Sequence, residues 1–344
     1  MSSPAPSHAM PTTRLGRTGL VVSRQVLGTM TFGLQTDEAT SFAILDAAVA
    51  GGINFIDTAD VYPLGGTLQT AGRTEEIIGR WLKAGGPARR RSLVLATKAV
   101  GKVGPNDWDG GASRKHLLDA IDASLARLQV DHVDLYQLHH DDRATPLDES
   151  LEALDTIVRS GRARYVGVSN FLAYRLARAL GRAEFLRVVK PVCVQPRYSL
   201  LFREIERETL PLVQEEGLGV IPYNPLAGGL LTGKYRGATD TPEANTRFTL
   251  GAAGSMYQDR YWNERSFTTV AQLQAVAAEA GLPMATLAVA WVMAHPQVTA
   301  PILGASRPEQ LKDTLAAAQV SLDPALKARL DALTAEYRKG DAPR

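Results

Sequence analysis

Short apolar runs alternate with longer segments of helical spacing along most of the chain. Each run is rich in aliphatic or β-branched residues and is bounded by polar or turn residues, which is typical of buried strands. The eight runs are QVLGTMTF, NFIDTA, SLVLATK, VDLYQLH, RYVGVSN, VCVQPRYS, GVIPYN and APILGAS. The apolar spacing between and after them predicts helices over residues 37–50, 74–83, 114–128, 147–160, 172–182, 206–216, 265–294 with a break at Pro283, and 308–318.

Eight strands that are each followed by a helix predict a parallel sheet with right-handed crossovers. An open doubly wound sheet alternates in the same way, but an unbroken series of eight units without a linker favours a closed (β/α)8 TIM barrel. We therefore expect a single-domain barrel over residues 12–338, with a long loop over 226–264 after the seventh strand and an extra C-terminal helix over 324–338. Residues 1–11 lack the charged and apolar regions of a signal peptide, so they are predicted to be a disordered leader, and residues 339–344 a tail.

The composition of the chain argues against nucleic acid and membranes as its partners. The chain has 344 residues, of which 45% are hydrophobic and 22% charged, enough for a substantial core. Its formal charge of +2 argues against a nucleic-acid partner, and no apolar stretch is long enough to cross a membrane. The single cysteine, Cys193, excludes an intramolecular disulfide and suits the reducing cytoplasm. The sequence leaves the oligomeric state open.

Polar residues end most of the predicted strands. In a barrel of this kind the active site lies at the C-terminal ends of the strands, so these side chains should share one rim. Each has a structural explanation when taken alone, such as a helix cap or a solvated strand end, but their convergence favours a site. They are Asp57, Lys98, His139, Ser169, Asn170, Gln195 and Tyr223, with Tyr62 in the loop after the second strand.

Four of these residue types suit protonation of a carbonyl oxygen. A tyrosine is a weak acid at neutral pH, but a nearby lysine ammonium favours its phenolate and makes its proton easier to donate. An aspartate can hold that lysine in place, and a histidine can donate a hydrogen bond to the substrate oxygen. The hydride must come from a cofactor, because no side chain supplies one. No G-x-G-x-x-G follows the first strand, so a Rossmann site is not supported.

The chain resembles aldo-keto reductases from Arg14 to about Leu333. The matching stretches are RLGRTGLVVSRQVLGTMTFG, FIDTADVY, EEIIGRWL, LATK, VDLYQLHH, RYVGVSNF, VQPRYSL, IPYNPLAGGLLTGKY and ILGASRPEQL. The resemblance implies a catalytic tetrad of Asp57, Tyr62, Lys98 and His139. In it Tyr62 is the general acid, His139 orients the carbonyl, and Lys98 with Asp57 tunes Tyr62.

The resemblance also implies an NADPH site and no metal. Ser169, Asn170 and Gln195 would bind the nicotinamide carboxamide, and Tyr223 would stack on its ring. Arg307 favours NADPH over NADH because a guanidinium can pair with the 2′-phosphate, although an arginine can also stack on adenine. The full set of expected cofactor residues is Thr29, Met30, Asp57, Ser169, Asn170, Gln195, Tyr223, Leu226, Gly229, Leu230, Lys234, Gly304, Ser306, Arg307 and Gln310.

Some neighbours and departures need a separate interpretation. We expect Asp60 to order its loop rather than transfer protons, and His140 to contact substrate or loop, because consecutive strand residues face opposite ways. Thr314 replaces the asparagine that many relatives place near adenine. The loop over residues 63–74 is longer than in many relatives and should reshape the substrate mouth.

These features predict an NADPH-dependent reductase of a small aldehyde or ketone. The alternative is a cofactor-binding regulatory subunit resembling potassium-channel β-subunits, which share the fold and motifs. Reduction of an activated C=C bond is disfavoured because relatives with that activity replace the histidine by glutamate, and here His139 is present. The sequence does not identify the substrate or the working direction.

Overall fold

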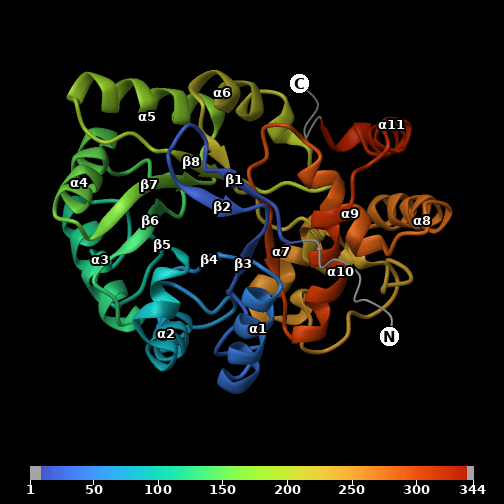
Figure 1. Ribbon diagram of the computed structural model, residues 1–344, viewed down its shortest axis with the longest axis horizontal. Helices are drawn as coiled ribbons and strands as arrows, with labels where there is room; N and C mark the ends of the chain where they lie inside the picture. Colours follow the sequence, from blue (N-terminus) through green and yellow to red (C-terminus); the bar gives the residue numbers. More distant parts are fainter. Residues whose placement is uncertain (1–8, 339–344) are drawn as a thin grey trace, which may run out of the picture.

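Parallel strands form a closed barrel ringed by helices in the computed structural model, which describes residues 9–338 (Figure 1). In the described chain the barrel strands are β3 (Val26–Gly28), β4 (Phe55–Asp57), β5 (Val94–Ala99), β6 (Val133–Leu138), β7 (Ala163–Ser169), β8 (Cys193–Gln195), β9 (Gly219–Val220) and β10 (Ile302–Gly304). Their order is β10-β3-β4-β5-β6-β7-β8-β9. The backbone N–H groups of Thr299 and Ile302 donate to Val220 and Pro222, which closes the barrel between β9 and β10. The predicted (β/α)8 barrel and its eight strands are confirmed.

Helices cover the outside of the barrel. Those of the described chain are α1 (Glu38–Ala50), α2 (Arg73–Arg91), α3 (Arg114–Leu128), α4 (Leu147–Arg159), α5 (Ala173–Leu186), α6 (Thr209–Glu216), α7 (Gly251–Tyr261), α8 (Glu264–Glu279), α9 (Met284–Met293), α10 (Leu311–Ala316) and α11 (Pro324–Leu333). Short 3-10 helices are η1 (Glu204–Glu206), η2 (Ala227–Thr232), η3 (Arg247–Thr249), η4 (Pro308–Gln310), η5 (Ala317–Gln319) and η6 (Ala335–Arg338). The first helix begins where Asp37 accepts a hydrogen bond from the Thr40 N–H, as an N-cap does.

An N-terminal hairpin that the sequence did not predict closes one end of the barrel. It consists of β1 (Thr12–Arg14) and β2 (Val21–Ser23), which pair antiparallel. Leu15 in its turn is fully buried with residues of the barrel interior. Gly16 has a positive φ of 58°, and a Cβ there would lie 2.6 Å from the Gly217 carbonyl oxygen. The hairpin thus packs against the start of β9, at the N-terminal end of the barrel.

Residues 226–264 are less irregular than predicted. They contain η2, η3 and the eleven-residue helix α7, so the long segment after the seventh barrel strand is partly helical. The α7 sequence, GAAGSMYQDRY, has two glycines and no apolar stripe, which explains why spacing did not reveal it. Aromatic packing holds it: Phe248 lies 4.8 Å from Trp262 and 6.3 Å from Tyr257 between ring centroids.

Helix α2 also extends beyond its predicted end at residue 83. It reaches Arg91, with a non-helical residue, Gly86, at a φ of 68° that divides it into two helical pieces. The predicted segment corresponds to the first piece.

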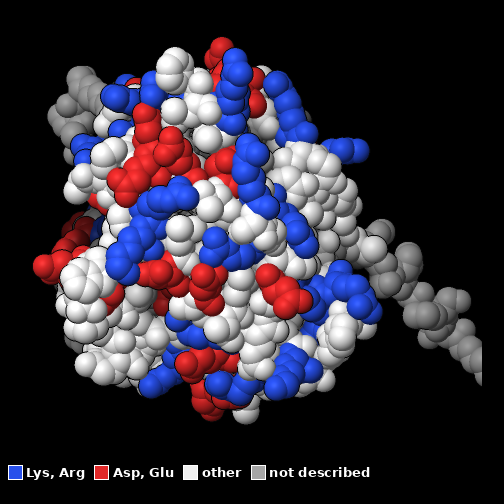
Figure 2. Space-filling model, turned by 90° about the vertical axis from the view of Figure 1, so that its left-hand side faces the viewer, with Lys and Arg blue, Asp and Glu red and all other residues white. Residues whose placement is uncertain are grey.

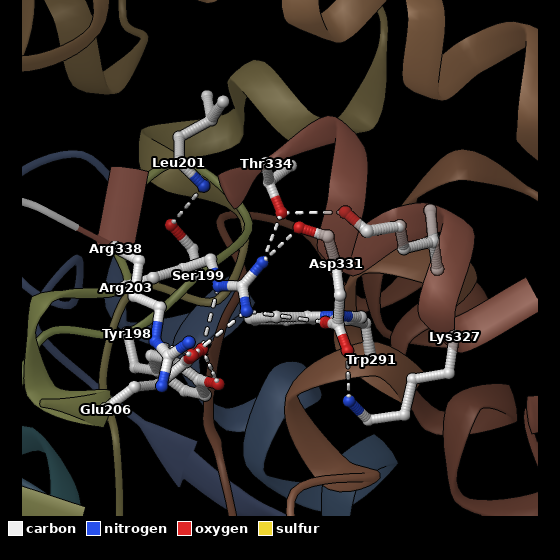
Figure 3. Close-up of polar contacts among 11 residues, drawn as sticks. Tyr198, Ser199, Leu201, Arg203, Glu206, Trp291, Lys327, Asp331, Thr334 and Arg338 are labelled. Atoms are coloured by element: carbon white, nitrogen blue, oxygen red, sulfur yellow. Dashed lines mark hydrogen bonds and ion pairs between the residues drawn. The ribbon is translucent and has the colours of Figure 1, made fainter. Parts of the chain in front are cut away.

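A buried arginine anchors the C-terminal helix that the sequence predicted (Figure 3). Arg203, in the loop after β8, is 5% exposed and lies between Glu206 and the end of α11. Its guanidinium donates to both Glu206 carboxylate oxygens, to the Asp331 carbonyl and to Thr334 Oγ1, and it lies 5.0 Å from the Trp291 ring centroid. These bonds fix the loop after β8 at the rim of the barrel.

The surface carries mixed charge. Figure 2 shows Lys and Arg interspersed with Asp and Glu on the face that carries α3 and α4. Ion pairs such as Lys115–Asp119 and Arg162–Asp122 lie there. No single helix within residues 9–338 is long and apolar enough to span a membrane, and the apolar pair α8 and α9 is bent by 94°.

The predicted leader falls mostly on residues 1–8 and the predicted tail on 339–344, which lie outside the described residues. The Pro11 carbonyl accepts from the Arg24 N–H, so the end of the leader contacts the barrel. The domain limits themselves remain a prediction.

Candidate active site

A buried ion pair joins the ends of β4 and β5. Lys98 Nζ lies 2.5 Å from Asp57 Oδ2, and the side chains are 0% and 3% exposed. Lys98 also donates to the Thr58 carbonyl at 2.7 Å. The second Asp57 oxygen, Oδ1, accepts from Gln137 Nε2 at 3.1 Å and from Gln195 Nε2 at 2.9 Å. Four hydrogen bonds therefore hold the two charges in one geometry.

Tyr62 and His139 lie beside this pair. The loop that carries Tyr62 is tied to β5 because the Asp60 N–H donates to the Lys98 carbonyl at 3.0 Å. The Tyr62 and His139 rings meet edge to face, with centroids 5.6 Å apart, and Lys98 Nζ lies 5.1 Å from the Tyr62 centroid. All four residues of the predicted tetrad thus lie together at the C-terminal end of the barrel.

The environment sets the protonation state of each group. Burial raises the pKa of the Tyr62 phenol above its ordinary value, and the Lys98 ammonium opposes that rise. Burial alone would lower the pKa of Lys98, but the charges of Asp57 and Tyr62 outweigh it and raise that pKa. Burial and the Lys98 charge hold the pKa of His139 well below its usual range. At neutral pH the site therefore holds a protonated phenol, an ammonium and a neutral imidazole.

A cavity of about 320 Å³ opens onto Asp57, Tyr62 and His139, while Lys98 is fully buried and reaches Asp57. Its walls combine apolar residues with polar groups from five strand ends, as small-molecule sites do. The lining residues are Gly28, Thr29, Met30, Asp57, Val61, Tyr62, Pro63, Leu64, Gly65, Gly66, His139, Ser169, Asn170, Gln195, Tyr223, Met256, Tyr257, Arg260 and Ile302. The first part of the 63–74 loop and three residues of α7 thus border the predicted catalytic groups.

The residues expected at a nicotinamide carboxamide lie together in this cavity. Asn170 Nδ2 donates to the His139 carbonyl and to Ser169 Oγ, both at 3.0 Å, and Tyr223 OH donates to Asn170 Oδ1 at 2.9 Å. Ser169 Oγ donates to the Gln195 carbonyl at 2.8 Å. This network fixes amide and hydroxyl groups around one end of the cavity. Thr29 Oγ1 donates to the Asp57 carbonyl, and the Met30 carbonyl accepts from Leu64 N–H.

The residues expected at phosphates lie on two other segments. Gly228 and Gly229 in η2 have φ angles of 72° and 100°, and a Cβ on Gly229 would touch nothing within 4 Å. Lys234 follows this turn and is exposed. The Leu230 side chain is fully buried in the core, so only its backbone is available to a ligand.

The second expected phosphate segment follows β10. Gly304 is exposed, and Gln310 Oε1 accepts from both the backbone N–H and Oγ of Ser306. Arg307 is exposed beside η4. Thr314, the departure from the family pattern, is buried and donates to the Leu311 carbonyl.

Two polar groups near η2 were missed by sequence reasoning. Arg247 Nη1 and Gln35 Oε1 are buried without a hydrogen-bond partner in the described chain. Gln35 also donates to the Asn245 carbonyl, two residues from Arg247. The Arg247 guanidinium lies 5.5 Å from the Tyr257 ring, and that ring lies next to Gly228. Buried polar groups normally have partners, so an orphaned donor and acceptor fit a bound polar ligand such as a dinucleotide. No sequence motif marked either residue.

Asp60 and His140 lie away from the tetrad chemistry. Within residues 9–338 both carboxyl oxygens of Asp60 are buried without a hydrogen-bond partner, and burial together with Glu75 raises the pKa of Asp60 well above the usual range. The Asp60 N–H donates to the Lys98 carbonyl, but this bond does not involve the carboxyl group, so the expected role of Asp60 in ordering the loop stays a prediction. His140 is exposed, and its Nδ1 lies 3.4 Å from the Asp141 carbonyl oxygen.

Comparison with known proteins identifies the family. The model of the Aldo/keto reductase family matches residues 25–335. The uncharacterized oxidoreductase YrpG of Bacillus subtilis is 46% identical over 319 residues, which cover 90% of this chain and 92% of the relative. A probable voltage-gated potassium channel subunit beta of Arabidopsis thaliana is 37% identical over 310 residues, which cover 89% of this chain and 90% of that relative. Protein tas of Escherichia coli is 36% identical over an alignment of 346 positions, which covers 94% of this chain and 97% of that relative. The chain therefore belongs to the aldo/keto reductase family of oxidoreductases.

Proposed function

We propose that this oxidoreductase uses NADPH to reduce an aldehyde or ketone to an alcohol, with Tyr62 as the proton donor. The observation that carries the proposal is the meeting of Asp57, Tyr62 and His139 at one cavity, with Lys98 paired to Asp57 beside them. A protonated phenol beside a buried ammonium is a proton donor whose conjugate base has a ready counter-charge.

Each side chain has a separate task in this mechanism. Tyr62 donates its phenolic proton to the carbonyl oxygen, and Lys98 stabilises the phenolate that remains. Asp57 holds Lys98 charged in a buried site. The neutral imidazole of His139 donates a hydrogen bond to the same oxygen and fixes its position. When bound, the nicotinamide supplies the hydride that no side chain provides.

The residues that would hold the cofactor have the right chemistry. Ser169, Asn170 and Gln195 offer amide and hydroxyl groups to a carboxamide, and Tyr223 offers a ring for stacking. Arg247, Lys234 and Arg307 offer cations to phosphates.

Arg307 supports NADPH in particular, because a guanidinium pairs with the 2′-phosphate that NADH lacks. Substitution Arg307→Ala should raise the Kd for NADPH by about tenfold or more and leave the Kd for NADH nearly unchanged, since a charge-assisted hydrogen bond is worth about 1.5–3 kcal/mol. Equal losses of affinity for NADPH and NADH would mean that Arg307 stacks on adenine or has a structural role. Fluorescence titration of the purified protein measures both constants.

The similarity to the Arabidopsis protein gives a second candidate. That relative is named a probable potassium channel subunit, and it covers 89% of this chain. Under this alternative the chain binds the cofactor as a regulatory subunit, and the tetrad turns over slowly or not at all.

A carbonyl screen separates the two candidates. Loss of absorbance at 340 nm is followed with NADPH and a panel of aldehydes and ketones, for the wild type and for Tyr62→Phe. The reductase proposal expects turnover of some carbonyls by the wild type and a loss of at least about a hundredfold in Tyr62→Phe, because general acid catalysis contributes about 10²–10⁴. Equal, slow rates for both proteins on every carbonyl would favour the regulatory subunit.

A further inference from the structure

One cation in the lining of the catalytic cavity has no role in the mechanism above. Arg260 lies on α7 and lines the cavity together with Met256 and Tyr257. These three positions fall on one face of the helix, so α7 presents that face to the cavity. The Arg260 side chain is half-buried.

Arg260 forms no ion pair with the residues that the structure describes. None of the ion pairs within residues 9–338 includes it. Its guanidinium lies 5.9 Å from the Tyr257 ring centroid, a contact to the aromatic face that leaves its N–H donors available. The position in the last turn of α7 also suits a cation, because the C-terminal end of a helix is negative.

The other charges of the cavity cancel. Asp57 is paired with Lys98, and His139 is neutral at physiological pH because desolvation holds its pKa well below the usual range. Arg260 is the only Lys or Arg in the described lining, so the space in front of Tyr62 carries one uncompensated positive charge.

The cations expected at the cofactor phosphates do not supply this charge. Lys234, Arg247 and Arg307 are all absent from the described lining of the catalytic cavity. Arg260 lines both this cavity and a neighbouring cavity of about 240 Å³, and Asn170 and Tyr223 also border both.

The other charged residues that line the neighbouring cavity, two arginines and two glutamates, balance one another. Arg197 lines it and stacks on Phe202, with 3.5 Å between the guanidinium carbon and the ring centroid. Glu204, Glu208 and Arg207 also line it. Both Arg197 and Arg260 act electrostatically on Tyr223, against the larger effect of burial on its pKa.

We propose that Arg260 is a specificity-determining residue that binds an anionic group of the substrate, so that this enzyme prefers carbonyl compounds carrying a carboxylate. The inference rests on the proposed reductase function and adds the substrate class to it. A guanidinium in a partly desolvated site donates two parallel hydrogen bonds to a carboxylate, which gives both affinity and orientation. The apolar walls, including Met30, Leu64 and Met256, suit the carbon skeleton between the carbonyl and the carboxylate.

A pair of matched aldehydes tests the proposal. The probes are 4-formylbenzoate and methyl 4-formylbenzoate, which share the aldehyde and ring and differ in the charge of the distal group. We expect wild-type kcat/KM to be at least tenfold higher for the acid. Arg260→Gln should lower kcat/KM for the acid by about 10–100-fold, mostly through KM, and change the ester less than threefold. Arg260→Lys should retain part of the preference.

Two controls separate the outcomes. Arg207→Gln removes an exposed guanidinium that lines only the neighbouring cavity, and it should leave the ratio of the two substrates unchanged. The Kd for NADPH is measured for each variant. Equal losses on acid and ester, no acid preference in the wild type, or a matching loss of NADPH affinity in Arg260→Gln would each overturn the proposal. Reduction of the ester but not the acid would also overturn the role of Arg260, but it would leave the reductase function intact. If the wild type reduced no compound in a wider carbonyl panel, the reductase function itself would be refuted.

Discussion

The Asp57–Lys98 pair gives the most quantitative prediction. Lys98→Met removes the ammonium from a site in which the two side chains are 0% and 3% exposed. Asp57 would keep its bonds from Gln137 and Gln195, but these donors are neutral. Breaking a buried pair in this way costs about 3–5 kcal/mol, because one charge is left unpaired in a medium that solvates it poorly. We expect the free energy of unfolding to fall by that amount.

A double-mutant cycle isolates the charge effect. Asp57→Asn in the Lys98→Met background removes the orphaned carboxylate, so the double variant should be more stable than Lys98→Met by about 1–3 kcal/mol. Urea unfolding followed by circular dichroism measures all four proteins. Lys98→Met should also lose most turnover while retaining NADPH affinity. A loss below about 1 kcal/mol in Lys98→Met, with no recovery in the double variant, would refute the assignment of a charged, buried pair.

Three further predictions concern groups outside the tetrad. Burial raises the pKa of Asp60, so the folded protein binds a proton that the unfolded chain releases above about pH 4, and stability falls as the pH rises. Asp60→Asn should therefore raise the thermal midpoint at pH 8, with a smaller gain near pH 4; an unchanged or lower midpoint at pH 8 by calorimetry would contradict this. Arg203→Met should lower the free energy of unfolding in urea by about 3–5 kcal/mol, because Glu206 loses its buried arginine partner. If Arg203→Met and the exposed Arg207→Met lowered that free energy by similar amounts, Arg203 would not anchor the C-terminal helix. Saturating NADPH should slow proteolysis within residues 226–264, because this segment carries both η2 and the cavity-lining face of α7, and unchanged cleavage would argue against closure over the cofactor.

The sequence predicted most of the barrel and the position of the tetrad. Apolar runs bounded by turn residues marked every barrel strand, and Asp57, Lys98 and His139 lie at strand ends where barrels place their chemistry. The family motif added Tyr62, which lies in the loop after β4 and not at a strand end.

Other features left no periodic signal. Strands β1 and β2 have three residues each, too few to show alternation. Helix α7 is held by aromatic contacts with η3 and its flanking residues rather than by an apolar stripe of its own. The importance of Arg260 and Arg247 depends on their three-dimensional surroundings. Arg260 lines the cavity without an ion-pair partner, and Arg247 has a buried N–H donor without an acceptor among the described residues.

The central claim is that Tyr62 and its neighbours complete a reduction in which the cofactor's hydrogen reaches the carbonyl carbon. The most direct measurement is a single-turnover reaction with NADPH deuterated at nicotinamide C4 on the transferred face, followed by mass spectrometry of the alcohol. Our account predicts one deuterium on the former carbonyl carbon with the wild type, and formation of that product slowed at least about a hundredfold in Tyr62→Phe. An alcohol without deuterium, or one formed at the same rate by Tyr62→Phe, would contradict it.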